Sequence, residues 1–173
     1  MKKFFPVLFL IGCAEPTVII DPTSFDKPLH WTVVSSSKED NNWKSALVDS
    51  LNEWQSRTNY MVQYDFFLVD DVEDKIPTKE NTIVVLNHDV PEGRADGKCF
   101  RKESSSKIYI ESSSLNDHGM RAVMMHELGH AMKLKHSDDD DSIMSGDGVK
   151  VNKVQNTDII QFCEVWNCRI KFQ

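Results

Sequence analysis

The sequence predicts an α+β domain, built from a twisted mixed sheet with helices packed against it. Its 173 residues leave room for one domain, and 40% of them are hydrophobic, enough for a substantial core. The third observation is the order of the expected elements. One strand and one helix precede the further strands and helices, which favours a mixed sheet with helices packed against it. The formal net charge of −7 argues against a nucleic-acid partner, which would normally meet a basic face.

The first half of the chain predicts two strands on either side of a helix. Residues 29–35 (LHWTVVS) are rich in β-branched side chains and contain no breaker, which favours a strand. Between residues 41 and 57 apolar side chains recur at helical spacing, and Asn41 or Asn42 can cap this helix. Residues 61–69 (MVQYDFFLV) predict the second strand.

The second half predicts two more strands and two more helices. Residues 82–86 (TIVVL) are wholly apolar, the pattern of a centrally buried strand, and residues 107–111 (KIYIE) alternate as a strand does. The longest helical pattern runs from residue 115 to about 133, with an Asn or Asp cap at 116–117. A final helix is expected over residues 157–166.

The N-terminus has the pattern of an export signal. Residues 1–3 (MKK) are positive, and residues 4–11 form an apolar run that is too short to span a membrane as a helix. The run ends in residues 10–13 (LIGC), which resemble the lipobox of bacterial lipoproteins. That resemblance implies that Cys13 is diacylated and becomes the mature N-terminus. The alternative is a simple cleaved signal with a chance cysteine.

This resemblance also implies a domain plan and a location. Residues 1–12 are then a signal peptide, residues 13–28 a lipidated tether, and residues 29–173 the folded domain. Losing two lysines with the signal makes the net charge −9, so the domain is expected to stand off from an anionic membrane. Ala14 lacks the Asp that favours inner-membrane retention, so an outer-membrane destination in the bacterial envelope is preferred, facing the periplasm or the outside.

Three cysteines remain after Cys13, so at most one disulfide forms among them. Cys163 and Cys168 would point about 140° apart on one helix, so they can pair only if the helix ends between them. Cys99 could pair with either one, and the sequence leaves all three pairings open.

The segment that carries chemistry is residues 126–130 (HELGH), followed by His136. His126 and His130 are four residues apart on the predicted helix, so both imidazoles leave one face and can share a Zn²⁺ ion. Glu127 is turned about 100° from His126, beside such an ion, where it can take a proton from a metal-bound water. The sequence therefore predicts a hydrolytic zinc site.

Residues 126–137 (HELGHAMKLKHS) resemble the signature of the metzincin zinc peptidases, H-E-x-x-H-x-x-G-x-x-H followed by a Met-turn. The resemblance implies that His126, His130 and His136 bind one catalytic Zn²⁺ and that Glu127 is the general base. It also implies a zinc-dependent endopeptidase that hydrolyses protein or peptide substrates with a metal-activated water.

Further residues are similar to the matrixin branch of the metzincins. Ser137 directly follows the third histidine, and residues 141–145 (DSIMS) look like the Met-turn, with Met144 under the metal. Residues 157–159 (TDI) of the last helix also fit that branch. The resemblance covers roughly residues 29–168 and implies a metzincin-like catalytic domain with an active-site helix, a Met-turn and a C-terminal helix.

The chain departs from the family pattern in two places. Lys133 stands where the family has a glycine, and a non-glycine residue with positive φ costs about 1 kcal/mol, so the turn before His136 is expected to be strained or built differently. Residues 145–148 (SGDG) replace the Pro and Tyr that usually follow the matrixin Met-turn, so the family's substrate preference does not carry over.

These departures motivate an alternative function. The chain would then be a catalytically inactive zinc-binding surface lipoprotein that binds a protein or peptide partner, and an acid from residues 138–141 would close the zinc site. For an active enzyme, the segment of residues 99–107 is the candidate sheet edge that pairs with an extended substrate. A third interpretation is that the motif is accidental, in which case the protein binds no stoichiometric metal. A monomer is expected.

Two acidic loops are each either an ordinary solvated loop or a cation-binding site. The four acids of residues 138–141 are expected to be a solvated loop tip, with a Ca²⁺ site as the alternative. Residues 87–89 and 96–97 form a second candidate cation loop, which lacks the matrixin spacing for structural zinc or calcium.

Overall fold

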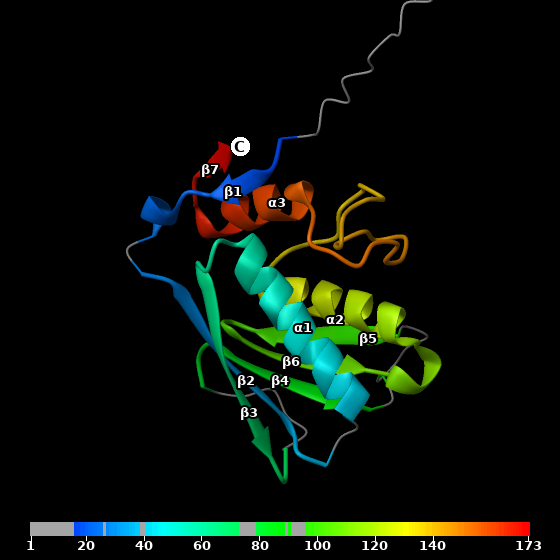
Figure 1. Ribbon diagram of the computed structural model, residues 1–173. Helices are drawn as coiled ribbons and strands as arrows, with labels where there is room; N and C mark the ends of the chain where they lie inside the picture. The colour runs from blue at the N-terminus through cyan, green and yellow to red at the C-terminus, as the bar shows by residue number, and fades with distance from the viewer. Residues whose placement is uncertain (1–15, 26, 39–40, 73–78, 89, 91–95) are drawn as a thin grey trace, which may run out of the picture.

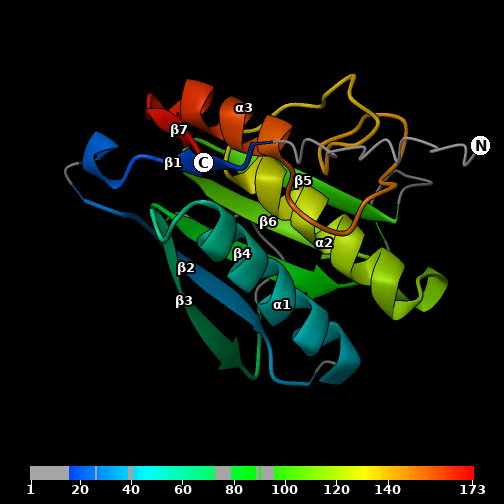
Figure 2. The same ribbon diagram turned by 45° about the horizontal axis from the view of Figure 1, so that its top comes forward.

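The computed structural model describes residues 16–25, 27–38, 41–72, 79–88, 90 and 96–173. It confirms the predicted α+β fold: helices α1 and α2 lie on one face of a five-stranded sheet, and α3 lies at one end (Figures 1 and 2). The helices are α1 (Asn41–Arg57), α2 (Asp117–Ala131) and α3 (Asn156–Trp166). The strands are β1 (Val18–Ile20), β2 (Leu29–Ser36), β3 (Val62–Val69), β4 (Thr82–Asn87), β5 (Gly97–Lys102), β6 (Ser105–Ile110) and β7 (Ile170–Phe172).

The sheet is mixed, with the strand order β3-β2-β4-β6-β5. Its first four strands in this order are parallel, whereas β5 pairs antiparallel with β6 and forms one edge. Sequence patterns predict all of these strands except β5, because its mixture of glycine, lysine, cysteine and arginine lacks a strand pattern. The predicted substrate edge, residues 99–107, covers most of β5 and the start of β6.

The helix α2 is buried along most of its length, which fixes the side chains that it carries. Its N-cap is Asn116, whose side chain accepts a hydrogen bond from the backbone N–H of Gly119. On one side α2 packs against α1, where the buried Trp54 donates its indole N–H to the carbonyl of Met125 at 2.9 Å. On another side it packs against β5 and β6. The helix is therefore a rigid support for a site.

The two ends of the chain meet in a small ribbon, which corrects the predicted tether. Strand β1 pairs antiparallel with β7, and the side chains of Val18 and Ile20 are 2% and 0% exposed. The prediction that residues 13–28 form a tether is therefore wrong for residues 18–24: the apolar side chains of Val18 and Ile20 are buried beside α3, and residues 22–24 form a short 3-10 helix. We call β1 and β7 together the terminal ribbon.

One disulfide joins Cys163 to Cys168, which resolves the three open pairings. Helix α3 ends at Trp166, and Asn167 adopts a left-handed conformation with φ of 53°, so the helix ends between the two cysteines as their pairing requires. Cys99 is a free thiol on β5, and burial raises its pKa to about 12. This thiol is protonated and poorly reactive at neutral pH.

The predicted signal peptide and the predicted lipid site at Cys13 lie outside the described residues. Among the helices in the described part of the chain, none has the length and apolar character needed to cross a membrane.

Candidate active site

The fold brings the three predicted histidines to one point. The Nε2 atom of His136 lies 3.3 Å from Nε2 of His126 and 3.1 Å from Nε2 of His130. Donors around one tetrahedral Zn²⁺ ion are about 3.4 Å apart, so this spacing suits such an ion. In the described part of the chain, these histidines are the one group of three or more His, Cys, Asp or Glu side chains that converge in this way.

Backbone carbonyls set the orientation of two of these rings. The Nδ1 atom of His126 lies 2.8 Å from the carbonyl oxygen of Ile143, and Nδ1 of His130 lies 3.0 Å from that of Leu134. Each Nδ1 therefore donates its hydrogen, which leaves the lone pair of Nε2 facing the common point. Burial lowers the pKa of His126 and lowers that of His130 to about 4, so both rings are neutral near pH 7. This donor set fits a zinc ion.

Lys133 makes the turn that delivers His136. Its φ is 75°, so lysine adopts the left-handed conformation expected of the family glycine. The N–H of Leu134 bonds to the carbonyl of Gly129, and the N–H of Lys133 bonds to that of His130, which is a Schellman motif. The Lys133 ammonium lies 4.9 Å from the ring centroid of Trp166. Lys133 therefore has the strained, positive φ that the sequence predicts, and the helix ends in a Schellman motif and not in a differently built turn.

The predicted Met-turn holds the chain after His136. The N–H of Ser137 bonds to the carbonyl of Met144 at 2.8 Å, and the N–H of Gly146 bonds to the carbonyl of Ser137 at 3.2 Å. Met144 is fully buried, and a Cβ placed on Gly129 would lie only 2.3 Å from its sulfur. Any side chain at Gly129 would displace Met144 from beneath the histidine-bearing helix.

The buried carboxylate of Asp158 fixes the Met-turn from α3. It accepts hydrogen bonds from Ser142 Oγ at 2.5 Å, Ile143 N at 3.1 Å, Met144 N at 3.4 Å and Gln155 N at 2.7 Å. The backbone of Ile143 thus connects the two residues, because its N–H donates to Asp158 and its carbonyl accepts from His126. Sequence reasoning noted Asp158 only as part of a family pattern. Asp158 also completes a capping box with Gln155, but this pair does not match the usual Ser/Thr-x-x-Glu/Gln signature, so no further sequence signal pointed to it.

Glu127 lies beside the three imidazoles with one oxygen unsatisfied. Its side chain is 5% exposed, and its carboxylate accepts a hydrogen bond from the backbone N–H of Cys99 on β5. The second oxygen, Oε2, is buried and has no hydrogen-bond partner in the described part of the chain. Burial raises the pKa of Glu127 to about 7. A carboxylate in this state can accept a proton from a group that enters the site.

Strand β5 approaches α2 closely enough for this contact because of Gly97. A Cβ on Gly97 would lie 2.5 Å from Cγ1 of Val123 and 3.0 Å from Cγ of Glu127. Sequence reasoning placed Gly97 only in a candidate cation loop and missed this packing role, which depends on two elements that are far apart along the chain.

The histidines and Glu127 open into a cleft of about 510 Å³. One wall is the start of the edge strand β5, and the other is the loop after the Met-turn, which includes Gly146 and Val149. Such a cleft beside the edge strand of a sheet suits an extended polypeptide.

The acidic loops do not assemble a second metal site in the described residues. Asp140 pairs with Lys150 at 2.8 Å, and Asp139 accepts a hydrogen bond from the backbone N–H of Asp141 at 3.0 Å. These contacts are typical of a solvated loop, so the calcium alternative is not supported. Much of the other candidate loop, residues 89 and 91–95, lies outside the described residues.

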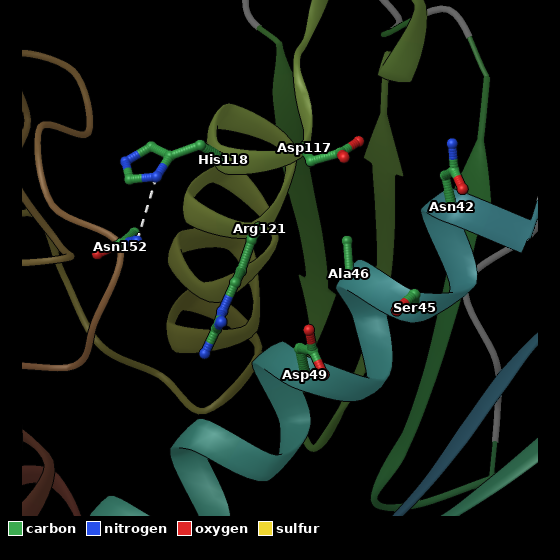
Figure 3. A pocket seen from close by; sticks show the side chains of 8 residues that line it. All are labelled: Asn42, Ser45, Ala46, Asp49, Asp117, His118, Arg121 and Asn152. Carbon is green, nitrogen blue, oxygen red and sulfur yellow. Dashed lines mark hydrogen bonds between the residues drawn. The ribbon is translucent and has the colours of Figure 1, made fainter.

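A second pocket, of about 320 Å³, lies between α1 and α2 near the start of each helix (Figure 3). Its lining is mostly polar, and the His118 and Asn152 side chains contact each other at 3.2 Å. It contains none of the predicted site residues.

Comparison with known proteins agrees with this geometry. The matrixin family model matches residues 21–161. A search of curated protein sequences found no match.

Two solved structures share the fold. Archaemetzincin from Methanopyrus kandleri has a TM-score of 0.56 and 13% sequence identity, over 81% of this chain and 96% of that chain. Metalloproteinase-II from Bacteroides fragilis has a TM-score of 0.51 and 10% identity, over 82% of this chain and 54% of that chain.

Proposed function

The chain belongs to the matrixin family of zinc metallopeptidases, and we propose on this basis that it is an endopeptidase whose zinc is held by His126, His130 and His136. Glu127 is the general base of the proposed reaction. Its substrates are proteins or peptides that bind in an extended form along the cleft. The observation that carries this proposal is the buried Oε2 atom of Glu127, which has no hydrogen-bond partner among the described residues and lies beside three converging Nε2 atoms.

Each residue has a defined task in this mechanism. When bound, zinc supplies the Lewis acidity that activates water and stabilises negative charge on the scissile carbonyl. Glu127 takes a proton from the attacking water at Oε2 and delivers it to the leaving amine. The Cys99 N–H holds the other oxygen of this carboxylate, so that Oε2 keeps its orientation.

The Met-turn and its anchor act through the histidines. The carbonyl of Ile143 fixes the ring of His126, and Asp158 fixes Ile143. Both are positioning residues, because they act on the ligands and not on the substrate.

The location of the enzyme is part of the proposal. The N-terminal pattern that ends at Cys13 supports a bacterial lipoprotein, with the outer membrane preferred. We take the protein to be a monomer.

The experiment is cleavage of a peptide library by the zinc-loaded chain, with Glu127→Ala and Glu127→Gln as test variants and Glu80→Ala as the matched control on the exposed surface. We expect both Glu127 variants to keep one zinc and to lose about 10²–10⁴-fold in kcat/KM. Chelation should abolish activity of the wild type, and added zinc should restore it. Unchanged cleavage by Glu127→Ala would refute the proposed role of this residue.

A further inference from the structure

We propose that Gln161 and Trp166 of α3 are positioning residues of the zinc site, which hold the turn that presents His136. The disulfide between Cys163 and Cys168 keeps Trp166 in place for this task. The proposal rests on the zinc peptidase function proposed above. It adds two side chains that act on the zinc ligands and not on the substrate.

The segment that needs support is residues 132–135, which join the end of α2 to His136 and which we call the ligand turn. Within it Lys133 has a φ of 75°, a conformation that is unfavourable for a residue with a Cβ. The carbonyl of Leu134 orients the ring of His130. A shift of the ligand turn would therefore displace two of the three Nε2 atoms that face the common point.

Helix α3 forms hydrogen bonds with the ligand turn at two points. Trp166 Nε1 donates to the carbonyl of Met132 at 2.9 Å, and Gln161 Oε1 accepts from the backbone N–H of Lys135 at 3.1 Å. The first bond holds the first residue of the turn, and the second bond holds its last residue. The two side chains therefore fix both ends of the ligand turn.

These contacts are directed at the turn and are not simple core packing. Gln161 and Trp166 are only partly buried, whereas Phe162 on the same helix is fully buried. The indole ring makes a further contact, because the Lys133 ammonium lies 4.9 Å from its centroid. Trp166 therefore contacts the strained residue of the turn as well as its first carbonyl.

The disulfide holds Trp166 in this position. Cys163 lies three residues before Trp166 and Cys168 lies two residues after it, so the bridge closes the chain around the tryptophan. The N–H of Cys168 also bonds to the carbonyl of Cys163 at 3.0 Å. On another side the ring meets Trp31 edge to face, with centroids 6.4 Å apart. The indole is thus fixed by the backbone and by a neighbouring ring.

Helix α3 supports His136 from both directions along the chain. Asp158 holds the Met-turn, which follows His136, whereas Gln161 and Trp166 hold the ligand turn, which precedes it. Residues that orient metal ligands typically contribute about 10–100-fold to metal affinity. Zinc affinity therefore depends on these side chains, although neither Gln161 nor Trp166 is itself a ligand.

The test measures the Kd of the full chain for zinc at pH 7, by competition with a chromophoric chelator. Trp166→Phe removes the indole donor and keeps an aromatic ring, and Gln161→Met removes the acceptor at nearly constant length. We expect each change to raise the Kd about tenfold and the two together to raise it at least about 50-fold. An unchanged Kd when both changes are present would overturn the proposal.

Two control variants show whether the hydrogen bonds cause the effect. Gln161→Glu keeps an oxygen that can accept from Lys135, so its Kd should stay within about threefold of wild type. Val165→Ala alters a 40% exposed position next to Trp166, and it should also stay within about threefold. A tenfold rise in Val165→Ala would mean that any change at the end of α3 weakens zinc binding, which would overturn the specific roles.

Circular dichroism of the metal-free variants separates positioning from a general loss of stability. Loss of stability lowers the apparent zinc affinity only when a large part of the metal-free protein is unfolded. We expect the variants to be folded without zinc at the temperature of the titration. A raised Kd that appears only in partly unfolded variants would overturn the positioning role.

Replacing both Cys163 and Cys168 by serine tests whether the disulfide acts through Trp166. We expect this cysteine-free end of α3 to raise the Kd about fivefold. In a protein that already carries Trp166→Phe, the same replacement should add less than about twofold, because both changes act on one hydrogen bond. Fully additive effects would overturn the proposed role of the disulfide.

Zinc titration without substrate also separates failure of this proposal from failure of the proposed function. A wild type that binds no zinc would overturn both. Raised Kd values in the Trp166 and Gln161 variants, together with no peptide cleavage by the wild type, would support the positioning role and overturn the peptidase.

Discussion

Two buried carboxylates lie on opposite sides of the histidine site, Glu127 on α2 and Asp158 on α3, and their hydrogen bonding is opposite in character. On the Met-turn side, Asp158 is 1% exposed and accepts hydrogen bonds from one hydroxyl and three backbone N–H groups. On the cleft side, Glu127 is 5% exposed, yet one of its oxygens has no partner in the described part of the chain.

The difference separates a structural acid from a reactive one. A buried carboxylate with several donors stabilises the loop that supplies those donors. A buried carboxylate with an unsatisfied oxygen costs stability, and it is available to take a proton from a bound group. The predictions below test this contrast, from the largest expected effect to the smallest.

The first prediction removes the structural acid. Asp158→Ala leaves buried donors of the Met-turn without an acceptor, so we expect a loss of about 4 kcal/mol in unfolding free energy. Urea unfolding of the metal-free protein measures it, and kcat/KM should fall as well because His126 loses its support. Thr157→Ala, at an exposed neighbouring position, is the control and should cost less than about 1 kcal/mol. A comparable effect of the two variants would contradict the anchor role of Asp158.

The second prediction concerns the terminal ribbon, which stabilises the domain without touching the site. Ile20 is fully buried and Ile19, on the other face of β1, is only partly buried. Ile20→Ala should cost about 3 kcal/mol and Ile19→Ala about 1 kcal/mol, with kcat/KM within twofold of wild type for both. Equal stabilities, or a large loss of activity on a folded Ile20→Ala protein, would show that the ribbon acts differently.

The third prediction isolates Glu127 in the metal-free protein. Burial raises its folded pKa to about 7, above the unfolded value of 4.5, so the folded state binds the proton more tightly. The contribution of the Glu127 carboxyl to the unfolding free energy therefore falls by about 2–3 kcal/mol as pH rises from about 4.5 to 7. Glu127→Gln cannot titrate, so it should become the more stable protein above pH 7.

Subtracting the unfolding free energy of Glu127→Gln from that of the wild type also cancels the pH dependence that the histidines contribute, which has the opposite sign. The lowered pKa values of His126 and His130 make stability rise with pH in the acidic range, but both proteins share this contribution. A difference in unfolding free energy between the two proteins that does not change from pH 4 to pH 8 would contradict the burial of an ionisable carboxyl in the cleft.

The fourth prediction concerns the turn between the two regions. Lys133 has φ of 75°, which favours glycine over any residue with a Cβ. Lys133→Gly should therefore be more stable than Lys133→Ala by about 1 kcal/mol, since neither keeps the contact with Trp166. Both should bind one zinc. If Lys133→Ala were the more stable protein, the left-handed turn would be absent in solution.

The central part of the molecule could be predicted from the sequence because its determinants are local. His126 and His130 share a helix face through their spacing, and the boundaries of α1 coincide with its apolar pattern. Lys133 could be identified as strained because a single position in a known motif needs positive φ.

The parts that sequence reasoning missed depend on pairing across long stretches of chain. Strand β1 spans only three residues, and its partner β7 lies about 150 residues away, so residues 13–28 resembled a tether. The unsatisfied oxygen of Glu127 depends on β5, which has no strand pattern of its own. Three of the four hydrogen bonds to Asp158 require α3 to meet the Met-turn in space.

The central claim is that three imidazoles bind zinc and leave Glu127 free to act as a base. Zinc-edge X-ray absorption on protein loaded with one equivalent of Zn²⁺ tests it most directly. We predict three imidazole nitrogens at about 2.0–2.1 Å in the wild type and in Glu127→Gln, and two in His136→Ala. Two imidazoles in the wild type, or a spectrum that His136→Ala leaves unchanged, would contradict the claim.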